Sequence, residues 1–300
     1  MGNLRDIKRR IKSVQNTTKI TRTMELIATA KSQACMNRIR GALPYFHALD
    51  EIAGQAQQAA GEGELEHPLL EQREVRRVAI LVVVANRGLC GGYNTNCLRL
   101  ARDHRERLLA EGKEVLLHPS GKKGINWLKF NRIPYEGDGY TQFEDKPAFA
   151  EVEAVADELI GAFLSGAVDR VDVVYTHYFS AGRQAPVVET VLPLAGLEGD
   201  ADTASSEQSG GGARVANFII EPNPRAILDT LFPLQAKLHL FRVYLEAATA
   251  EQIYRRVAMK NATDNGIEVG KTLKMDYNRA RQSQITNEIL EVLGGAEALA

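Results

Sequence analysis

Apolar residues recur at helical spacing near both ends of the chain. In the N-terminal segment, Leu4, Ile7, Ile11 and Val14 follow one another at steps of three and four residues, which is typical of a helix that packs against another helix. A stripe this narrow cannot stabilise a lone helix, because isolated helices gain most of their stability from packing. We expect the stripe to resume after a small shift of phase, at Ile20, Met24 and Ile27.

The C-terminal segment carries a similar but more polar stripe. Gly266 and Gly270 are weak points in it, because glycine lowers helix stability. The economical arrangement pairs the two terminal segments as an antiparallel coiled coil. The residues that we expect on the C-terminal seam are Ile253, Val257, Asp264, Ile267, Lys271, Lys274, Tyr277, Gln284, Ile289, Val292 and Ala296.

The positions of the prolines divide the chain into three parts. All 10 prolines lie between Pro44 and Pro233. An interior proline costs a helix about 3 kcal/mol, because it removes a backbone donor and collides with the preceding turn. The two flanks without proline, Met1–Leu43 and Leu234–Ala300, can therefore form helices of roughly 60 and 90 Å at 1.5 Å per residue.

The central part alternates segments typical of strands and helices, which is the pattern of a parallel α/β sheet. The sequence thus predicts an α/β protein: a coiled coil of long N- and C-terminal helices plus a central domain with a mainly parallel sheet. We expect the domains to span residues 1–60, 75–222 and 223–300, with a flexible loop at 198–213. The predicted strands are Val78–Ala85, Glu114–His118, Val171–Phe179, Pro186–Leu192 and Val215–Ile220, and the predicted helices are Asn94–Glu111 and Pro147–Leu164.

Composition excludes several classes of protein. The hydrophobic share of 44% and the charged share of 25% are ordinary globular values. The longest apolar run, Val78–Ala85, is far shorter than the ~20 residues of a membrane helix, and Met1–Arg10 lacks the apolar core of a signal peptide. We therefore expect a cytosolic chain unless a partner holds it at a membrane. Cys35, Cys90 and Cys97 form no CxxC pair, so we expect free thiols and no metal site.

Charge is distributed unevenly along the chain. The first forty residues contain ten basic residues and only two acidic residues, a net charge of +8, so the total of -1 leaves -9 for the rest. Closely spaced cations can bind nucleic acid, form a solvated helix face or dock on an acidic protein. No aromatic residue for stacking on bases precedes Tyr45, which disfavours nucleic acid.

Two glycine-rich stretches are candidates for phosphate binding. Arg87–Asn94 follows a predicted strand and opens a predicted helix, but its spacing matches neither of the two common phosphate-loop motifs. Ser120–Gly124 lacks the upstream glycine and the following hydroxyl. A tight turn is therefore the favoured interpretation of both, and a nucleotide site is the alternative.

No other residues point to chemistry. Histidines such as His104, His118, His177 and His239 show no metal-ligand spacing, so we expect surface or structural roles for them. No Asp or Glu stands out as half of an acid–base pair. We expect no catalytic residue, no cofactor and no metal.

Three segments resemble the gamma-subunit family of F-type ATP synthases. They are Leu4–Ala28 at one end, Ala258–Asn265 together with Tyr277–Glu288 at the other, and the Arg87–Asn94 loop in the centre. The resemblance implies a non-catalytic central rotor shaft, which couples proton-driven rotation of the membrane c-ring to ATP synthesis on beta subunits. It also implies three alpha and three beta subunits, the epsilon subunit and the c-ring as partners. No nucleic acid is expected, nor is direct membrane insertion. The implied location is peripheral, on the cytoplasmic face of the bacterial inner membrane.

The resemblance also assigns contact residues. It implies that a basic group on the N-terminal helix meets an acidic lever loop of the beta subunits, with Met24 beside it. A polar group near the C-terminus would meet other beta-subunit loops, and an apolar tip would turn in a hydrophobic collar. The basic group is Arg9, Arg10, Lys19 and Arg22; the polar group is Arg281, Gln282, Thr286 and Glu288; the tip is Leu290, Val292, Leu293, Ala296 and Leu299.

Overall fold

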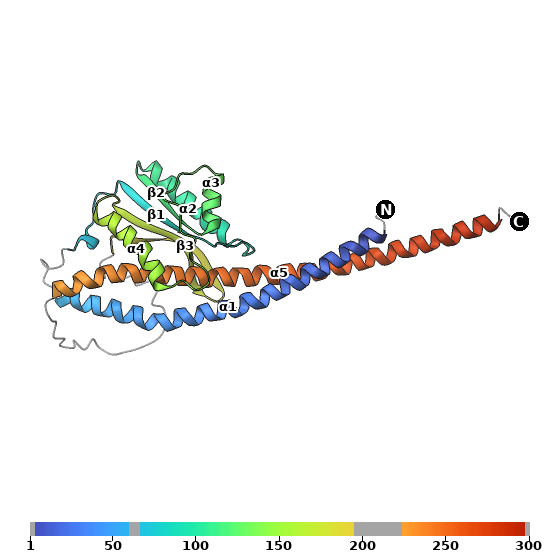
Figure 1. The fold of residues 1–300 in the computed structure, drawn as a ribbon, viewed down its shortest axis with the longest axis horizontal. Helices are drawn as coiled ribbons and strands as arrows, with labels where there is room; N and C mark the ends of the chain where they lie inside the picture. The colour runs from blue at the N-terminus through green and yellow to red at the C-terminus, as the bar shows by residue number, and fades with distance from the viewer. Residues whose placement is uncertain (1–3, 60–66, 195–223, 298–300) are drawn as a thin grey trace. The chain divides into compact units, whose positions relative to one another are not determined.

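The computed structural model describes residues 4–59, 67–194 and 224–297 (Figure 1). Its two long helices are α1 (Leu4–Ala59) and α5 (Pro224–Glu297). The predicted strand at 215–220 and the predicted loop at 198–213 lie outside the described residues. Between the long helices come the 3-10 turn η1 (Pro68–Leu70), β1 (Arg77–Val83), α2 (Tyr93–Ala110), β2 (Glu114–Ser120), α3 (Lys122–Phe130), α4 (Phe149–Leu164), β3 (Arg170–Ser180) and β4 (Arg183–Leu192).

Long helices at both ends are confirmed, but the prolines do not bound them. Pro44 lies inside α1 and Pro233 lies inside α5. The flanks without proline are therefore only part of each helix, and both helices continue past a proline towards the middle of the sequence. Each proline removes one helical hydrogen bond, and the packing of the surrounding turns offsets that loss: Phe46, two residues after Pro44, and Phe232, the neighbour of Pro233, are both buried.

The chain divides into two compact units. The helical unit comprises Met1–Lys31, Leu89–Gly91 and Gln252–Ala300. The α/β unit comprises Ser32–Gly88 and Gly92–Glu251.

The α/β unit is built on a four-stranded sheet with the strand order β2-β1-β3-β4. Strand β1 runs parallel to β2 and to β3, and Val78 lies opposite Val115 on one side and Arg170 on the other. Strand β4 runs antiparallel to β3 as a hairpin. The prediction of a mainly parallel sheet is confirmed, with β4 as the exception.

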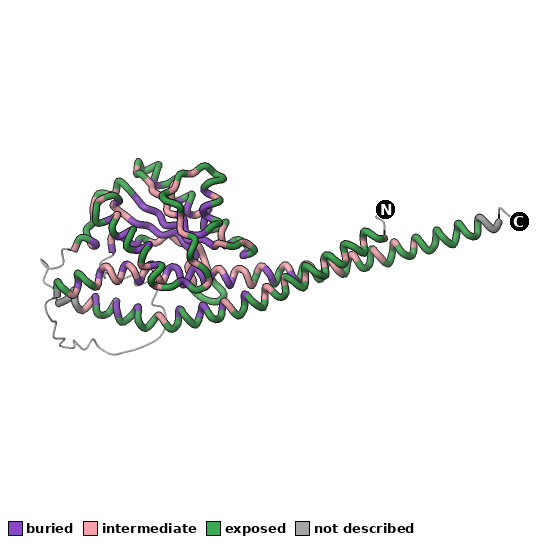
Figure 2. Tube along the Cα trace, in the orientation of Figure 1, coloured by how far each residue is buried: buried purple, intermediate pink, exposed green. Residues whose placement is uncertain are grey.

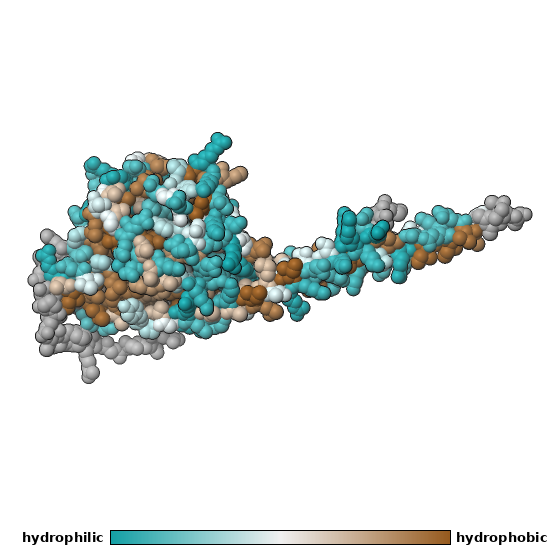
Figure 3. Space-filling view, viewed as in Figure 1, coloured by the Kyte–Doolittle hydropathy of each residue, from teal (hydrophilic) through white to brown (hydrophobic). Residues whose placement is uncertain are grey.

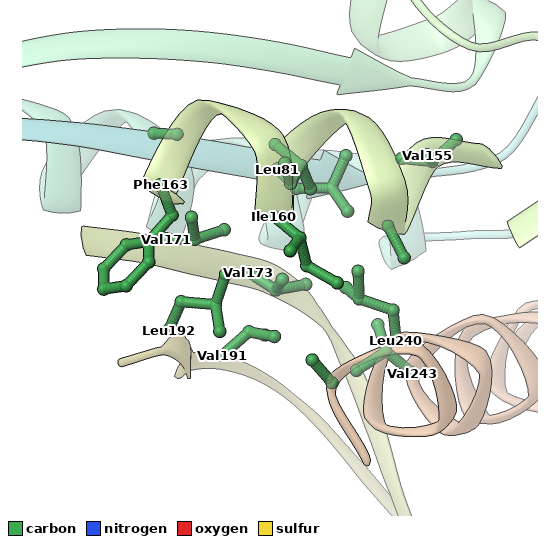
Figure 4. Close-up of a cluster of buried hydrophobic side chains, with 14 of the residues drawn as sticks. Leu81, Val155, Ile160, Phe163, Val171, Val173, Val191, Leu192, Leu240 and Val243 are labelled. Atoms are coloured by element: carbon green, nitrogen blue, oxygen red, sulfur yellow. The ribbon is translucent and has the colours of Figure 1, made fainter. Parts of the chain in front are cut away.

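Both faces of the sheet are covered, which explains the nearly continuous apolar run in β1. Alternate residues of β1 point to opposite faces: Val78, Ile80 and Val82 pack with residues of α2 and α3. Ala79, Leu81 and Val83 pack with α4 and with the first part of α5 (Figure 4). The buried residues of Figure 2 follow this sheet and the helices on it.

A third cluster ties the last part of α1 to α5 within the α/β unit. Ile39, Phe46 and Leu49 of α1 pack with Leu238 and Leu245 of α5. Residues from the two ends of the sequence therefore form part of the same core.

In the helical unit, α1 and α5 pair in antiparallel fashion. The Thr21 and Thr263 hydroxyls form a hydrogen bond of 2.9 Å. Thr18 lies against Gly266, and each step forward along α1 is matched by an equal step backward along α5. The predicted antiparallel pairing is thus observed.

The residues on the seam differ from those we expected. On α1 the stripe continues in phase through Thr18, Thr21 and Ala28, with Met24 half-buried between the last two as expected, whereas Ile20 is 59% exposed and Ile27 is 51% exposed. The phase shift was wrong because a hydrogen-bonded threonine pair and small residues hold the helices together where hydropathy predicts isoleucine.

The predicted C-terminal seam was also wrong at most positions. Ile253 is buried and Tyr277 is half-buried, as expected. The side chain of Ala296 lies outside the described residues. The observed seam has strict steps of three and four at Met259, Thr263, Gly266, Gly270, Leu273, Tyr277 and Ala280. The expected members that are exposed instead are Val257, Asp264, Ile267, Lys271, Lys274, Gln284, Ile289 and Val292.

Gly266 is a contact point of the helix pair. A Cβ added there would overlap with the Thr18 Oγ1 and lie 3.4 Å from the Thr18 Cβ. At Gly270 the nearest atom to an added Cβ, the Val14 Cγ1, is 4.0 Å away. The first glycine allows the backbones to approach, so our description of both glycines only as weak points was incomplete.

We predict opposite effects for alanine at the two glycines. Gly270→Ala should stabilise the chain by about 0.5–1 kcal/mol, because alanine favours the helix and has room. Gly266→Ala should destabilise it by about 1–3 kcal/mol, because the added methyl overpacks the seam. Urea unfolding followed by circular dichroism measures both changes.

Thr18→Ala supplies the control for this pair. Removing the threonine hydroxyl makes room for the methyl, so Gly266→Ala should cost less in the Thr18→Ala background than alone. Equal effects of the two glycine substitutions would contradict the close approach at Gly266.

Candidate functional site

The basic residues assigned to partner contact all lie on the exposed surface of α1. Arg9, Arg10, Lys19 and Arg22 are exposed, and Met24 is half-buried beside the seam. Arg9 forms an ion pair of 3.3 Å with Asp6, one turn earlier, and both side chains are largely exposed. An exposed ion pair of this kind contributes little to the stability of the fold. Binding of a partner at these cations would therefore sacrifice little stabilisation.

Sequence reasoning missed an apolar patch next to these cations. Leu26 is 66% exposed, and Ile20 and Ile27, two turns apart on one face of the helix, are exposed as well. The signal was present, but we assigned two of these residues to the seam. The helical unit therefore presents cationic and apolar side chains on the same helix.

The polar residues assigned near the C-terminus are exposed on α5. The Thr286 hydroxyl donates to the Gln282 carbonyl at 2.9 Å, within the helix itself. Glu288 accepts a hydrogen bond of 2.9 Å from the Gln284 amide. Arg281 is exposed as well. The structure thus places this group on a single helix, where the side chains are accessible.

The predicted apolar tip is largely exposed. The far part of α5 shows apolar surface along one side (Figure 3). Leu299 and the side chain of Ala296 lie outside the described residues. The exposed residues are Ile285, Ile289, Leu290, Val292 and Leu293. Apolar surface at this density marks a site that a partner covers.

The Arg87–Asn94 loop is a tight turn between β1 and α2. The Asn94 Oδ1 accepts a hydrogen bond of 2.9 Å from the Ala85 amide and so closes the turn. Gly91 has a φ of 56°, which glycine adopts without strain, and an added Cβ would lie 3.6 Å from that of Ala258. The glycines therefore have a structural explanation.

The crevice where an α/β sheet ordinarily binds ligands is filled. Such ligands bind at the carboxyl ends of parallel strands, where the chain turns to either side of the sheet. Here Tyr244 of α5 reaches that edge, its hydroxyl donating to the Ser120 hydroxyl at 3.0 Å, and its ring lies 4.1 Å from that of Phe143. The remaining cavity is about 30 Å³, which has room for about two or three waters, whereas ligand pockets span roughly 300–1,000 Å³.

Ser120–Gly124 forms the turn from β2 into α3. Gly121 has a φ of 106°, and a Cβ there would overlap with the Val84 carbonyl oxygen. The first backbone amide of α3, at Lys122, donates to the Asn86 Oδ1 at 2.9 Å. Close backbone approach thus explains this glycine, and the turn interpretation holds for both stretches.

A buried Asp–His pair has no room for a nucleophile. The His104 Nε2 lies 2.8 Å from the Asp172 Oδ2, and the Arg107 guanidinium donates to the His104 Nδ1 at 2.8 Å. The arginine therefore stands where the hydroxyl of a catalytic triad would lie. Burial would raise the pKa of Asp172, but the His104 hydrogen bond and the Arg170 charge outweigh it and lower that pKa. The cluster is therefore a structural network and not a catalytic site.

A second buried network fixes α5 to the hairpin of β3 and β4. The Glu189 carboxylate accepts from His239 and Arg242 at 2.9 Å and from the Tyr175 hydroxyl at 2.7 Å. Burial alone would raise the pKa of Glu189. The hydrogen bond and charge of His239 outweigh it, with smaller contributions from Tyr175 and Arg242, and the pKa falls to about 2.

The three cysteines are free and buried. Burial raises the pKa of the Cys97 thiol to about 12, so this thiol is not a nucleophile at neutral pH. Within the described residues, no cluster of His, Cys, Asp and Glu could hold a metal ion.

Comparison with known proteins agrees with these features along the whole chain. Residues 3–299 match the family model that is described as ATP synthase. The chain is 43% identical to the ATP synthase gamma chain of Rhodopirellula baltica, covering 100% of this chain and 99% of that protein. It is 41% identical to the gamma chain of Leptospira biflexa, with 100% of both covered.

The chain belongs to the ATP synthase gamma chain family.

The fold of this gamma chain agrees with solved structures. A chain in the Euglena gracilis mitochondrial ATP synthase, in the structure of OSCP, F1 and the c-ring, superposes with a TM-score of 0.65 at 17% identity, covering 99% of this chain and 94% of that one. As a gamma chain, the protein is a non-catalytic subunit of the F-type ATP synthase, in which the beta subunits carry out catalysis. None of its described helices is long and apolar enough to cross a membrane.

We predict that Glu189 makes the stability of the gamma chain depend on pH. Because the pKa of Glu189 is lower in the folded state, its contribution is complete above about pH 5 and is lost as the pH falls towards 2. Glu189→Gln should therefore cost about 3 kcal/mol at pH 7, and the difference from the natural chain should shrink in acid. Urea unfolding between pH 3 and pH 7 measures it.

Glu74→Gln is the matched control, because the ion pair of Glu74 with Arg76 is exposed on both sides. It should change the free energy of unfolding by less than about 0.5 kcal/mol at every pH. A Glu189→Gln variant whose stability runs parallel to that of the natural chain across this range would contradict the role of the network.

Proposed function

We propose that the paired helices of the helical unit transmit rotation through an uneven surface. The protein is the central-stalk subunit of the F-type ATP synthase, which couples rotation of the c-ring to ATP synthesis. Its partners are the alpha and beta subunits, the epsilon subunit and the c-ring. The observation that carries the proposal is that cationic, polar and apolar groups all lie outside the seam of α1 and α5, whose middle part is built from threonines and a glycine.

An uneven surface is what the coupling requires. A shaft can shift a catalytic site between conformations only if it binds those conformations with different free energies. A shift from mostly open to mostly closed needs several kcal/mol of differential contact. Because the two helices differ in charge and hydropathy, each beta subunit around them would meet a different side of the pair. Rotation would then present these sides in turn.

The contact residues of this proposal are those that the resemblance assigns. We assign Arg9, Arg10, Lys19 and Arg22, with Met24 beside them, to the acidic lever loop of the beta subunits, where charge complementarity guides without fixing one pose. The C-terminal group meets other beta-subunit loops, and the apolar side of α5 meets a hydrophobic collar through non-directional contact. That polar group is Arg281, Gln282, Thr286 and Glu288. All of these groups are exposed except Met24, which is half-buried. Their exposure supports the assignment.

We further propose that the chain works at the cytoplasmic face of a bacterial inner membrane, in a proton-driven complex. Its similarity to gamma chains of bacteria, including Leptospira biflexa, supports this location. The functional division into 1–60, 75–222 and 223–300 belongs to the same proposal. Co-purification of the chain with alpha, beta and epsilon subunits and with the c-ring tests the assembly directly.

The filled crevice predicts that the purified chain does not hydrolyse ATP. An enzyme that used the Arg87–Asn94 loop would lose its turnover on Gly91→Ala, so phosphate release is measured for the natural chain and for this variant. The expected result is background release from both. Turnover that disappears in the variant would favour the nucleotide-dependent enzyme instead, and tight duplex binding with a steep salt dependence would favour the nucleic-acid alternative.

We predict that Arg9→Glu with Arg10→Glu weakens coupling. Two favourable contacts, each worth roughly 1 kcal/mol, become repulsive, so proton pumping per ATP hydrolysed should fall about twofold or more. The measurement is acidification of inverted membrane vesicles together with ATP hydrolysis in the same sample.

Lys146→Glu with Arg183→Glu makes the matched control. It also reverses two exposed charges, at positions of the α/β unit to which no contact with a partner subunit is assigned. This control should leave the ratio of pumping to hydrolysis unchanged. Unchanged coupling in the Arg9 and Arg10 variant, with the complex intact, would remove these residues from the contact.

A further inference from the structure

Helix α3 and the residue pair after it carry an unbalanced positive charge. Lys122, Lys123, Lys129 and Arg132 are all exposed. No acidic residue occurs between Gly121 and Tyr135. Within the part of the chain that the structure describes, none of these four cations forms an ion pair. We call this set of residues, with the aromatic side chains between them, the α3 surface.

Several other cations of the α/β unit form ion pairs with neighbouring carboxylates. Arg73 pairs with Glu71 at 2.7 Å, and Lys113 pairs with Glu111 at 2.6 Å. Lys237 lies 2.9 Å from carboxylates of both Glu153 and Asp157. The local absence of carboxylates at the α3 surface is therefore not a general property of the unit.

An aromatic side chain protrudes from the middle of this positive charge. Phe130, the last residue of α3, is 87% exposed, more than any other large apolar residue that the structure describes. Trp127, one turn earlier, is half-buried and packs against the core on that face of the sheet. The helix is thus anchored by one aromatic residue and offers the next to solvent.

Helical spacing places the charges and the aromatic residues side by side. Lys123, Trp127 and Phe130 follow at steps of four and three, so they share one stripe of α3. Lys122 and Lys129 lie on the neighbouring stripe. Cations that flank an exposed aromatic ring are typical of helices lying at the boundary between lipid headgroups and acyl chains.

We propose that the α3 surface binds an anionic lipid surface. The four cations contact headgroup phosphates, and the Phe130 ring enters the acyl boundary. A lipid surface is favoured over an acidic protein because Lys129 and Arg132 flank a protruding ring, and a fluid layer accommodates such a ring without a matching pocket. The inference goes beyond the rotor function and uses none of the residues assigned above to the beta-subunit loops or the hydrophobic collar.

The experiment uses the full chain and vesicles of two compositions. One contains phosphatidylglycerol and phosphatidylcholine in equal amounts, and the other contains phosphatidylcholine alone. Trp127 is the single tryptophan of the chain, so quenching of its fluorescence by brominated acyl chains reports the position of α3 itself. The expected result is binding and quenching with the anionic vesicles and neither with the neutral ones.

Variants separate the α3 surface from the basic N-terminal helix. Each cation near an anionic surface changes partition about fivefold, so Lys122→Ala with Lys129→Ala should weaken vesicle binding about 25-fold. Phe130→Ala should reduce quenching of Trp127 in the bound chain, and circular dichroism should show that it is folded, since the ring is exposed. Lys8→Ala with Lys12→Ala removes two charges from α1 and should leave the quenching of bound chain unchanged.

Four outcomes would overturn the proposal. Equal binding to neutral and anionic vesicles would exclude charge recognition. Binding to the anionic vesicles without quenching of Trp127 would place the contact on α1. Quenching that is lost in the Lys8 and Lys12 variant and in no other variant would do the same. A soluble polyglutamate peptide that binds the α3 surface as tightly as the anionic vesicles, with no effect of Phe130→Ala, would show an acidic protein site instead.

Discussion

The close approach of α1 and α5 in the helical unit governs what the surface of that unit can do. Thr18, Thr21 and Thr263, together with Gly266, bring two backbones together with little apolar bulk. A seam made of leucine and isoleucine would bury those side chains and separate the helices further. In this middle part of the seam, the contact that pairs the helices leaves the bulky side chains of Ile20, Leu26 and Ile27 accessible. Pairing and recognition therefore use different residues of one helix.

In the α/β unit, the clustered charged residues form structural networks and not a ligand site. The Glu189 and Asp172 networks lie on opposite sides of the β3–β4 hairpin, and each carboxylate is surrounded by donors from another element. Such networks cost desolvation unless every member is satisfied, and they favour one arrangement of helix and sheet over others. These networks therefore hold α2 and the first part of α5 in fixed positions on the sheet, and the described residues leave no open crevice for a small molecule there.

Much of this fold could be predicted from the sequence because it depends on periodicity. Three sequence patterns indicate burial directly: the apolar run of β1, the alternation of strands and helices, and the stripe from Leu4 to Val14. The middle of the seam could not be found in this way, because glycine and threonine are favoured there by backbone distance and hydrogen bonding, which hydropathy does not register. The filling of the crevice by Tyr244 was equally hidden, since it joins residues more than one hundred positions apart. The exposed contact groups came from resemblance, because a cation in water leaves no periodic signal.

The placement of α5 on the sheet has a consequence for the order in which the molecule is made. Leu228, Phe232, Ala236 and Leu240 supply one wall of the sheet's main core, yet they leave the ribosome after all four strands. A nascent chain that ends before them exposes the apolar side of β1 and β3, a surface that attracts chaperones and other unfinished chains. Coverage of this face of the sheet thus waits for the last quarter of synthesis, and truncated products expose the apolar surface that the finished helix covers.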